Sequence, residues 1–358
     1  MNVGIKRKET RPVNLGGVQI GGGAPVVVQS MTCTDTRDVK STVKQIKKLE
    51  DAGCEVVRVA VASRDAASAL KNIKKKIKIP LIADIHFSDR LAIDAIEAGA
   101  DGIRINPGNL PPEKIKKITK AAKSNNVVIR IGINSGSLEK DILMKYGKPS
   151  AEALVESATK NISLLEDLGF TAIKVSLKSS DVITTIKAYQ MISRKMDYPL
   201  HLGLTEAGSV INAAIKSSIS LGILLCDGIG DTIRVSVTGD PLLELPIAYG
   251  ILRALNIRRV GPDIISCPTC GRCEVDLLKL SKEVERKLSG IRDYFKVAIM
   301  GCVVNGPGEA AEADIGIAGG KGMGFLFKKG KRIKKIREDE FIPALLDEIH
   351  LMIENKEK

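Results

Sequence analysis

Two short stretches near the C-terminus carry the residues best suited to metal chemistry. Cys267–Cys273 reads CPTCGRC, and Gly301–Glu309 reads GCVVNGPGE. Cys267, Cys270 and Cys302 form a Cys-x-x-Cys pair and a distant third cysteine on turn-rich sequence, which presents thiolates to one soft metal centre. Zinc sites usually close with a second Cys-x-x-Cys pair or a histidine pair, and neither follows here. Three cysteines with an oxygen ligand suit a four-iron, four-sulfur cluster that keeps one distinct iron.

Eight strand-like segments rich in β-branched and aliphatic residues precede these stretches. They are Pro25–Thr32, Val56–Val61, Leu81–Phe87, Gly102–Pro107, Val127–Ile133, Ala172–Leu177, Leu200–Glu206 and Thr232–Val237. Helical patterns alternate with them, for instance over Val39–Ala52 and Glu152–Leu168, and an eighth helix is expected over Asp240–Arg259. An open doubly wound sheet is the alternative, but eight strands is the number that a closed barrel requires. The sequence therefore predicts an α/β fold that begins with an N-terminal (β/α)8 TIM-type barrel.

Polar and charged residues lie in or just after the second half of these strands. They are Arg58, Asp84, His86, Arg104, Asn106, Arg130, Asn134, Lys174, Ser176, His201, Thr205, Glu206, Arg234 and Ser236. Many are two residues apart, so their side chains leave the same face of a strand. In a barrel that face is the interior, and chemistry is built at its C-terminal mouth.

Five of these residues are cations, whereas only Asp84 and Glu206 are carboxylates. Burying the surplus costs several kcal/mol per unpaired ion, so the excess predicts a bound anion. Arginine forks match phosphate oxygens in pairs, which favours a diphosphate or polyphosphate substrate. No P-loop motif occurs, and Gly16–Gly17 and Gly21–Gly23 are predicted to form turns rather than a dinucleotide loop.

A change of composition at Gly261 marks a second domain, so the barrel is expected over residues 1–260 and a smaller domain over 261–358. Its expected elements are a helix over Val275–Leu288, a strand over Lys296–Gly301, a loop to Glu309, two strands over Asp314–Ala318 and Met323–Phe327, and a closing helix from Phe341. This order predicts a small α/β domain whose cysteines lie on loops that can bend around a cluster.

The formal net charge of +13 over 358 residues suggests nucleic-acid binding at first. Much of it lies in lysine-rich stretches such as Lys74–Lys76 and Lys328–Arg332, which are interpreted as solvated helical faces. No nucleic-acid fold signature accompanies them, so we expect no nucleic-acid partner. A basic surface suits an acidic electron carrier instead.

No apolar run approaches the ~20 residues of a membrane span, and Met1–Gly17 lacks the apolar segment of a signal peptide. An odd number of cysteines in such a chain indicates thiols and metal ligands rather than disulfides. The protein is therefore expected to be cytoplasmic, without a membrane partner. Cys54 and Cys226 are expected in the core, and Cys33 near the barrel mouth.

Several motifs in this chain are specific enough to indicate a family. They are Ala24–Thr32, Asp84–Phe87, Arg104–Asn109, His201–Gly208, Gly228–Ser236 and Gly301–Glu309. With them the chain resembles, nearly end to end, the two-domain bacterial 4-hydroxy-3-methylbut-2-enyl diphosphate synthases (the IspG/GcpE family). The resemblance implies a TIM-type barrel followed by a small α/β iron–sulfur domain. It also implies an oxidoreductase of non-mevalonate isoprenoid biosynthesis. Such an enzyme performs the two-electron reductive ring opening and dehydration of 2-C-methyl-D-erythritol 2,4-cyclodiphosphate to 4-hydroxy-3-methylbut-2-enyl diphosphate.

Carried over by motif, the resemblance implies one 4Fe-4S cluster per chain. Its ligands would be Cys267, Cys270, Cys302 and Glu309. Glu309 would be the replaceable ligand that leaves one iron open to a substrate oxygen. Glu206 would face the reacting carbon as a proton donor or electrostatic partner, and Asn305 would contact the substrate or the open iron.

The resemblance also implies which barrel residues contact the cyclic diphosphate. The phosphate contacts would be Arg58, Arg104, Arg130, Lys174, Arg234 and Ser236. Further contacts would come from Asp84, His86, Asn106, Asn134, His201 and Thr205. A flavodoxin or ferredoxin would supply the electrons, and a head-to-tail homodimer would cap one subunit's barrel with the other's cluster.

Cys273 departs from the family's pattern and creates a Cys-x-x-Cys-x-x-Cys run. An all-thiolate cluster would lose its open iron, so we expect Cys273 to be a bystander rather than a ligand that replaces Glu309. Two rival functions stay open. One is a different iron–sulfur barrel enzyme acting on an anion, such as a dehydratase or a radical enzyme, and the other is a zinc-stabilised RNA-binding protein.

Overall fold

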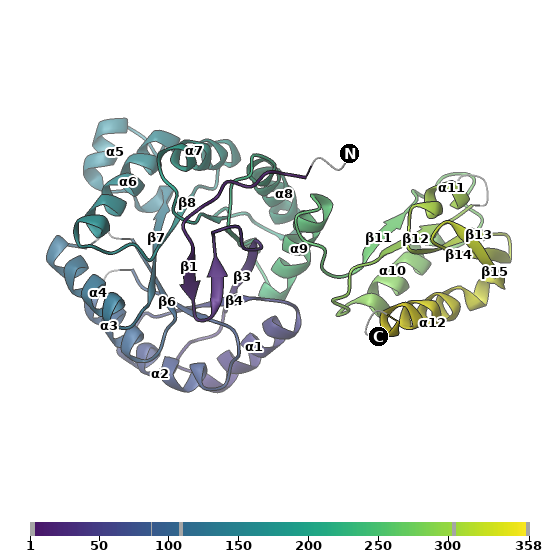
Figure 1. Ribbon diagram of the computed structural model, residues 1–358, viewed down its shortest axis with the longest axis horizontal. Coiled ribbons are helices and arrows are strands. Elements are labelled where there is room, and N and C mark those ends of the chain that lie inside the picture. The colour runs from purple at the N-terminus through teal and green to yellow at the C-terminus, as the bar shows by residue number, and fades with distance from the viewer. Residues whose placement is uncertain (1–3, 87, 107–109, 303–305, 356–358) are drawn as a thin grey trace. The chain divides into compact units, whose positions relative to one another are not determined.

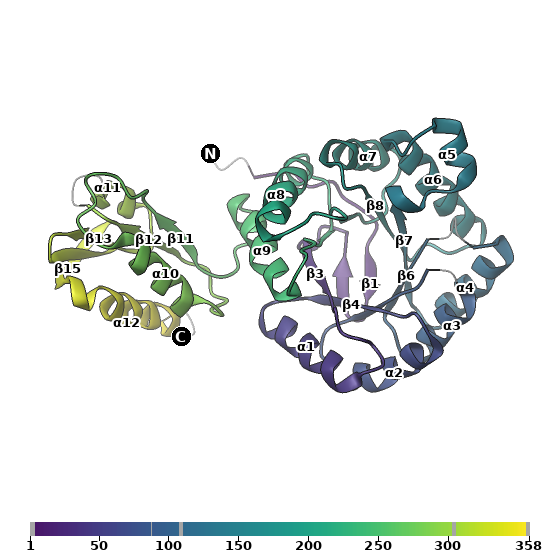
Figure 2. The ribbon, with the colours of Figure 1, turned by 180° about the vertical axis from the view of Figure 1, so that it is seen from behind.

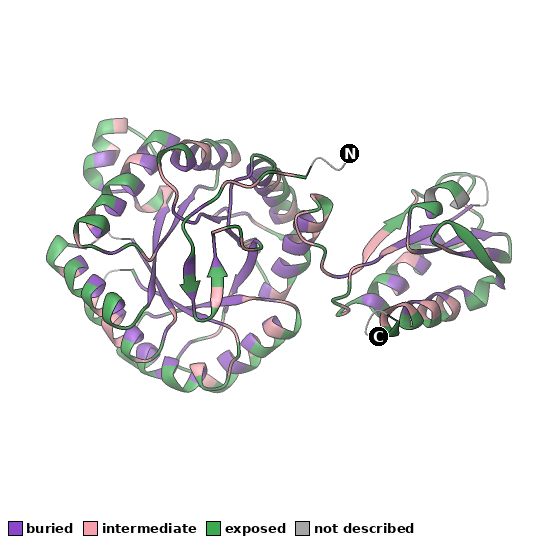
Figure 3. Ribbon diagram, in the orientation of Figure 1, coloured by how far each residue is buried: buried purple, intermediate pink, exposed green. Residues whose placement is uncertain are grey.

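The computed structural model describes residues 4–355 apart from 87, 107–109 and 303–305. It divides into two compact units, Met1–Arg258 and Arg259–Lys358. Each unit has its own sheet and its own buried core, as the burial colours show (Figure 3).

The first unit is a barrel of eight parallel strands in the order β8-β7-β6-β5-β4-β3-β10-β9. The strands are β3 Val27–Met31, β4 Val56–Ala60, β5 Leu81–Asp84, β6 Gly102–Ile105, β7 Val128–Asn134, β8 Ile173–Lys178, β9 His201–Leu202 and β10 Thr232–Ile233. A parallel bridge between Val175 and Leu200 brings β8 to β9 and completes the ring. All eight predicted strands are confirmed, although most are shorter than predicted and the last two have only two residues each.

Helices surround this barrel, as Figures 1 and 2 show from opposite sides. They are α1 Val39–Asp51, α2 Arg64–Lys74, α3 Asp89–Glu97, α4 Pro112–Ser124, α5 Lys140–Tyr146, α6 Ala151–Asp167, α7 Val182–Lys195, α8 Val210–Cys226 and α9 Glu244–Ala254, with short 3-10 turns at Ser135–Ser137 and Pro241–Leu243. Their starts follow ordinary capping chemistry: the side chain of Ser63 accepts from the N–H of Ala66, and that of Asp181 from the N–H of Thr184.

A hairpin that the sequence analysis missed lies across the barrel (Figure 1). It consists of β1 Val13–Leu15 and β2 Val18–Ile20, joined by the predicted turn at Gly16–Gly17, where both glycines have positive φ. Leu15 and Ile20 are fully buried and pack against residues at the starts of the barrel strands, such as Val27, Val56 and Val128. The hairpin therefore closes the N-terminal end of the barrel. Its three-residue strands are too short to show a period in the sequence.

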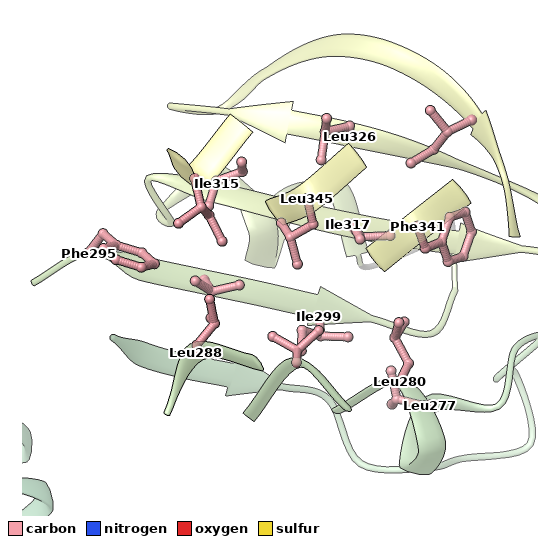
Figure 4. Packing of buried hydrophobic residues seen from close by; sticks show 14 residues of the cluster. Leu277, Leu280, Leu288, Phe295, Ile299, Ile315, Ile317, Leu326, Phe341 and Leu345 are labelled. Atoms are coloured by element: carbon pink, nitrogen blue, oxygen red, sulfur yellow. The ribbon is translucent and has the colours of Figure 1, made fainter. Parts of the chain in front are cut away.

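The second unit is a five-stranded mixed sheet in the order β11-β12-β13-β14-β15, with helices packed on it. Its elements are β11 Asp263–Ser266, α10 Leu277–Leu288, β12 Lys296–Met300, α11 Gly306–Ala311, β13 Ile315–Gly320, β14 Met323–Lys328, β15 Lys331–Arg337, a 3-10 turn Glu338–Glu340 and α12 Phe341–Glu354. Figure 4 shows the core, in which Leu280 of α10 and Leu345 of α12 meet Ile299 and Ile317 of the sheet. The prediction of a barrel followed by a small α/β domain is confirmed.

Two predictions for this unit are wrong, and one strand was missed. The loop expected from Gly301 to Glu309 contains the start of the short helix α11. The lysine-rich stretch at Lys328–Arg332 is the turn between β14 and β15 rather than a helical face. Strand β11 was not predicted, because Asp263–Ser266 is short and only partly buried, so it has no clear apolar pattern.

Two cysteines outside the candidate metal site were predicted to lie in the core. Cys54 is buried, as predicted. Cys226 is exposed, so its assignment to the core is wrong, because it lies at the last position of α8 beyond the buried face of that helix. Among the described residues, no helix is long and apolar enough to cross a membrane.

Candidate active site

A row of charged side chains runs across four neighbouring strands of the barrel. Asp84 of β5, Arg104 of β6, Arg130 of β7 and Lys174 of β8 are successive partners in the strand register. Register partners of a parallel sheet point to the same face, so three cations and one carboxylate stand side by side. All four are buried. The predicted convergence of strand-borne cations is therefore present.

Part of this charge has no partner inside the described structure. The Nε and Nη1 atoms of Arg130 and the Nζ atom of Lys174 are buried without a hydrogen-bond partner among the described residues. Burial, reinforced by neighbouring cations, lowers the pKa of both groups well below their ordinary values. A buried donor without an acceptor is costly, so these atoms are placed for an acceptor that the chain does not supply.

Asp84 is the main counter-charge on this side of the barrel. Its carboxylate lies 3.2 Å from Arg104 Nη1 and 3.6 Å from Arg58 Nε. Burial alone would raise its pKa, but the charges of Arg58, Arg104 and Arg130 lower it to about 2. His86 Nε2 lies 3.8 Å from the same carboxylate, and burial, with a contribution from the arginines, lowers the pKa of this histidine. Asp84 is thus ionised and shared.

Lys178 belongs to this site although the sequence analysis missed it. It is buried at the end of β8, two residues beyond Ser176, and its Nζ lies 3.4 Å from His201 Nε2. His201 Nδ1 in turn lies 2.7 Å from Thr232 Oγ1. Burial lowers the pKa of both Lys178 and His201 well below their ordinary values, and nearby cations lower both further. The alternation Lys174, Ser176, Lys178 would have revealed this lysine, but the predicted strand ended one residue too early.

Glu244 is another buried carboxylate beside the barrel cations, and it was also missed. It is almost fully buried at the start of α9 and forms a forked pair with Arg234, at 2.8 Å and 3.2 Å. Ser30 donates to the same carboxylate at 2.7 Å. Nothing in the local sequence separates this glutamate from a surface residue at a helix start. With Glu244 present, Arg234 is neutralised, and the unbalanced charge is concentrated on Arg130, Lys174 and Lys178.

Glu206, the other predicted carboxylate, is exposed just beyond β9. Its φ of +54° places it in the left-handed region, which is uncommon for a residue other than glycine and concentrates at functional sites. It forms no pair with the barrel cations among the described residues. The structure therefore leaves its carboxylate available at the end of a barrel strand, rather than in the buried charge row.

The remaining predicted contacts lie around the same strand ends. Asn106 donates to Ser137 O at 3.0 Å, while its buried Oδ1 has no partner among the described residues. The amide of Asn134, correctly oriented, accepts from Arg104 Nη2 at 3.1 Å. Ser236 Oγ donates to Leu204 O at 3.2 Å, and Thr205 is half-buried beside Glu206.

The cysteine site lies at the carboxyl ends of two paired strands in the second unit. Cys267 directly follows β11 and Cys302 lies two residues beyond β12, and these strands are parallel neighbours. The Gly301 N–H donates to Cys267 Sγ at 3.3 Å. Cys270 is exposed on the turn that follows, where hydrogen bonds from the backbone and side chain of Arg272 lower the pKa of its thiol. The fold thus brings the predicted thiols to one edge.

Helix α11, which contains position 309, packs on β12 and β13 beside this edge. The side chain of Glu309 and the whole of Asn305 lie outside the described residues, so their predicted roles stay predictions. Among the described residues, no three cysteine, histidine or acidic side chains are already grouped as a metal site. The donor set fits an iron–sulfur cluster by its chemistry, since thiols on turns can close around it.

Cys273 has a different environment from the other thiols. Its Sγ donates to Val275 O at 3.2 Å, and its side chain packs against the core that contains Leu277 and Leu280. A side chain at Gly301 would overlap this sulfur. Cys273 therefore fills space above Gly301 as a small core residue.

Comparisons with known proteins agree with this division of the chain. The family model described as the GcpE TIM-barrel domain matches residues 10–249, and the model of the GcpE protein C-terminal domain matches residues 263–351. The barrel is similar to type I 3-dehydroquinate dehydratase from Clostridium difficile, with a TM-score of 0.52, 16% identity and coverage of 69% of this chain and 98% of that one. At 16% identity, the similarity to this dehydratase shows the barrel fold alone.

Close relatives match both units in one alignment. A protein of Thermodesulfovibrio yellowstonii is 57% identical over 96% of this chain and 99% of its own length. Another, from Clostridium perfringens, is 56% identical over 96% of this chain and 98% of its own. Both are named 4-hydroxy-3-methylbut-2-en-1-yl diphosphate synthase (flavodoxin). The resemblance inferred from the motifs is confirmed, and the chain belongs to the GcpE family.

Proposed function

We propose that this protein reduces 2-C-methyl-D-erythritol 2,4-cyclodiphosphate to 4-hydroxy-3-methylbut-2-enyl diphosphate. The observation that carries this proposal is the row of buried barrel cations, in which Arg130 and Lys174 have donors without acceptors among the described residues. A cyclic diphosphate supplies both the negative charge and the oxygens that these donors need. The reaction consumes two electrons and two protons, opens the ring at a C–O bond and releases one water.

The barrel unit binds the substrate in this proposal. Arg58, Arg104 and Arg130 direct their guanidinium groups at phosphate oxygens, while Asp84 keeps the first two in position. Lys178, held beside His201, approaches from β8, the strand next to that of Arg130. The exposed carboxylate of Glu206 faces the opened carbon and provides or orients a proton. The other proposed substrate contacts come from Lys174, Arg234, Ser236, His86, Asn106, Asn134 and Thr205.

The second unit holds a 4Fe-4S cluster in this proposal. Its ligands are Cys267, Cys270, Cys302 and Glu309, one cluster to each chain. When bound, the cluster supplies single electrons to the substrate. The strand ends at Cys267 and Cys302 provide a rigid base, and the turn at Cys270 adjusts to it. Thiols and thiolate ligands are stable in a reducing compartment, which is why we place this enzyme with its seven cysteines in the cytoplasm.

The decisive experiment is anaerobic turnover of the cyclodiphosphate by the reconstituted protein with dithionite as reductant. We expect conversion to the linear diphosphate with loss of one water, detected by phosphorus NMR and mass spectrometry. A protein with a full complement of iron and sulfide that forms no product would refute the proposal. A colourless protein that binds zinc and RNA would instead support the binding-protein alternative.

We also propose that the enzyme is a homodimer in which the cluster unit of one chain serves the barrel of the other. The support from this chain is an unpartnered apolar face on α8. Ile211, Ile215, Ile219 and Ile223 follow each other at intervals of four residues, and their exposures are 73%, 54%, 47% and 42%. A continuous apolar stripe of this kind on a surface helix marks a protein–protein contact.

A further inference from the structure

The last part of the sheet in the second unit carries an unusual concentration of positive charge. Between Ile315 and Arg337 the chain has eight lysines and arginines and no aspartate or glutamate. Five of them lie on β15, which is the edge strand of the sheet, and every residue of this strand except Ile336 is exposed. The residues that matter below are called the basic edge: Lys329, Lys331, Arg332, Lys334 and Lys335.

The charge of the basic edge is not neutralised by this chain. Lys328 and Arg337, at its two ends, pair with Glu348 at 2.7 Å and Asp339 at 2.9 Å. The four lysines between them have no carboxylate partner among the described residues. Unpaired like charges repel one another, and only solvent and salt reduce this repulsion. An acidic partner removes it, so the arrangement favours association with negative charge.

Arg332 of the basic edge stacks on Phe325, a half-buried aromatic residue of β14 that packs on the buried Phe327. The Arg332 guanidinium lies 3.6 Å from the centre of the Phe325 ring, and Phe325 and Phe327 meet edge to face at 6.5 Å. Stacked arginine and aromatic residues are the types that dominate binding energy in protein interfaces. Arg332 occupies one face of the half-buried Phe325 ring, which leaves less of the ring for stacking by a nucleic-acid base and favours a protein partner over RNA.

The basic edge borders the helix that carries the proposed cluster ligand Glu309. At Gly330, an added Cβ would lie 3.2 Å from the carbonyl oxygen of Ala311, so the β14–β15 turn touches the end of α11. Lys329 N–H donates to Asp314 O at 3.0 Å just after this helix. Phe327 shares a buried cluster with Ala310 and Ala313. A protein bound at the basic edge would therefore be adjacent to α11.

We propose that the basic edge is the docking surface for an acidic flavodoxin that reduces the cluster. This inference rests on the proposed function, since it gives the electron donor of that reaction its place on the chain. Charged residues on an edge strand also prevent edge-to-edge aggregation. Positive or negative charges would serve that role equally well. Five cations without carboxylate partners among the described residues, one of them stacked on Phe325, are specifically complementary to an acidic protein surface.

The test reverses three charges and compares two matched variants of the reconstituted holoenzyme. One carries Lys331→Glu, Lys334→Glu and Lys335→Glu on β15. The control carries Lys116→Glu, Lys117→Glu and Lys120→Glu on α4, which are equally exposed and change the net charge by the same amount. Cluster reduction by a reduced acidic bacterial flavodoxin is followed by stopped-flow absorbance at low and high salt, and turnover with dithionite is measured in parallel.

We expect the β15 variant to be reduced by flavodoxin about tenfold more slowly than wild type at low salt, with a smaller difference at high salt. The α4 variant should keep at least most of the wild-type rate, and all three proteins should turn over equally with dithionite. Replacing the three β15 lysines by glutamine should give an intermediate loss, which also tests whether introduced glutamates merely disturb folding.

Equal rates of cluster reduction by flavodoxin in the β15 and α4 variants would overturn the docking proposal. Labelled single-stranded RNA provides a second check. If the wild type raises its fluorescence anisotropy and the β15 variant does not, the docking proposal is overturned in favour of nucleic acid. Failure of the proposed function looks different. In that case even the wild type forms no product with dithionite, whatever its rate of reduction by flavodoxin.

Discussion

At the scale of single residues, the barrel interior holds cations that the protein alone does not stabilise. Arg130 and Lys174 have buried donors without acceptors among the described residues, and the Nζ atom of Lys178 lies 3.4 Å from His201 Nε2. Such an arrangement lowers the stability of the free protein and strengthens the binding of an anion. The same burial, with the charges of neighbouring cations, lowers the pKa of each of these three groups well below its ordinary value.

Replacing Lys178 by methionine should therefore separate stability from binding. We expect the KM for the cyclodiphosphate to rise at least about tenfold, which corresponds to about 1.4 kcal/mol of lost binding. The free energy of unfolding should stay unchanged or rise by about 1 kcal/mol, because a buried amine has been removed. Lys187→Met on α7 changes an exposed lysine and serves as the control. Unchanged steady-state kinetics for Lys178→Met would exclude this lysine from the site.

Substrate binding should also take up protons. In the empty barrel, burial and neighbouring cations lower the pKa values of Lys174 and Lys178, and a bound diphosphate should raise both pKa values toward the ordinary 10.5. Affinity should therefore fall as the pH rises between the lowered and the restored pKa values. Calorimetric titration in buffers of different ionisation enthalpy measures the protons taken up. Zero uptake in the wild type, or the same uptake in Lys178→Met, would contradict this account.

The sequence predicted these side chains unevenly, and the reasons are physical. Arg104, Arg130 and Lys174 were predicted because strand alternation places residues two apart on one face. Lys178 obeys the same rule and was lost only through a strand boundary. Glu244 could not be predicted, because it enters the barrel from α9 and its partner Arg234 is identified only by the three-dimensional contact.

At the scale of elements, the cysteine site depends on the close approach of β11, β12 and the turn between β11 and α10. Gly301 is the residue at which they meet. Its N–H contacts Cys267 Sγ, its carbonyl accepts from Glu274 N–H at 2.9 Å, and the Cys273 sulfur fills the space where a side chain would stand. This explains why glycine occupies the position without a positive φ.

Gly301→Ala should consequently displace the turn that carries Cys270 and Cys273. We expect overpacking of about 1–3 kcal/mol and a lower content of iron and sulfide per chain after anaerobic reconstitution. Gly250→Ala in α9 is a matched control, because its added Cβ meets open space on a helix and should be neutral or stabilising. If Gly301→Ala reconstitutes as fully as Gly250→Ala, the turn is not tied to the metal site.

Cys273 and Glu309 should behave oppositely in spectroscopy. Cys273→Ala removes a core thiol that donates a hydrogen bond to Val275 O, so we expect the free energy of unfolding to fall by about 1 kcal/mol. Because Cys273 is not a ligand in this proposal, the EPR spectrum of the reduced cluster should not change. Glu309→Ala should alter the Mössbauer signal of one iron. If Cys273→Ala abolished the cluster signal while Glu309→Ala preserved it, Cys273 would be the fourth ligand.

Element order in the barrel followed from the sequence because buried parallel strands and amphipathic helices have different periods. The second unit was harder. Strand β15 has one buried residue in seven, so its sequence gives no strand pattern, and its pairing with β14 is what makes it a strand. Helix α11 is six residues of glycine, proline, glutamate and alanine, and packing on β12 and β13 rather than helix propensity stabilises it.

At the scale of the whole molecule, each unit has half of the proposed chemistry. The barrel has the unpaired cations, and the smaller unit has the thiols. The sequence alone gives no indication of which chain's units cooperate, because the same two halves occur in every copy. The isoleucine stripe on α8 is the described feature that bears on this question, since a closed two-fold dimer needs a self-complementary apolar face.

Mixing two inactive variants distinguishes catalysis within one chain from catalysis between chains. Glu206→Gln disables the barrel and Cys302→Ser disables the cluster unit, so each alone should be inactive. If the units cooperate across a dimer, random exchange makes half of the dimers mixed, and one of the two sites in each is intact. Activity should then return to about a quarter of the wild-type value. No recovery after verified exchange would place both halves of the site in the same chain. Adding Ile215→Lys and Ile219→Lys to both partners should yield monomers in light scattering and abolish the recovery, because the charged residues disrupt the α8 stripe.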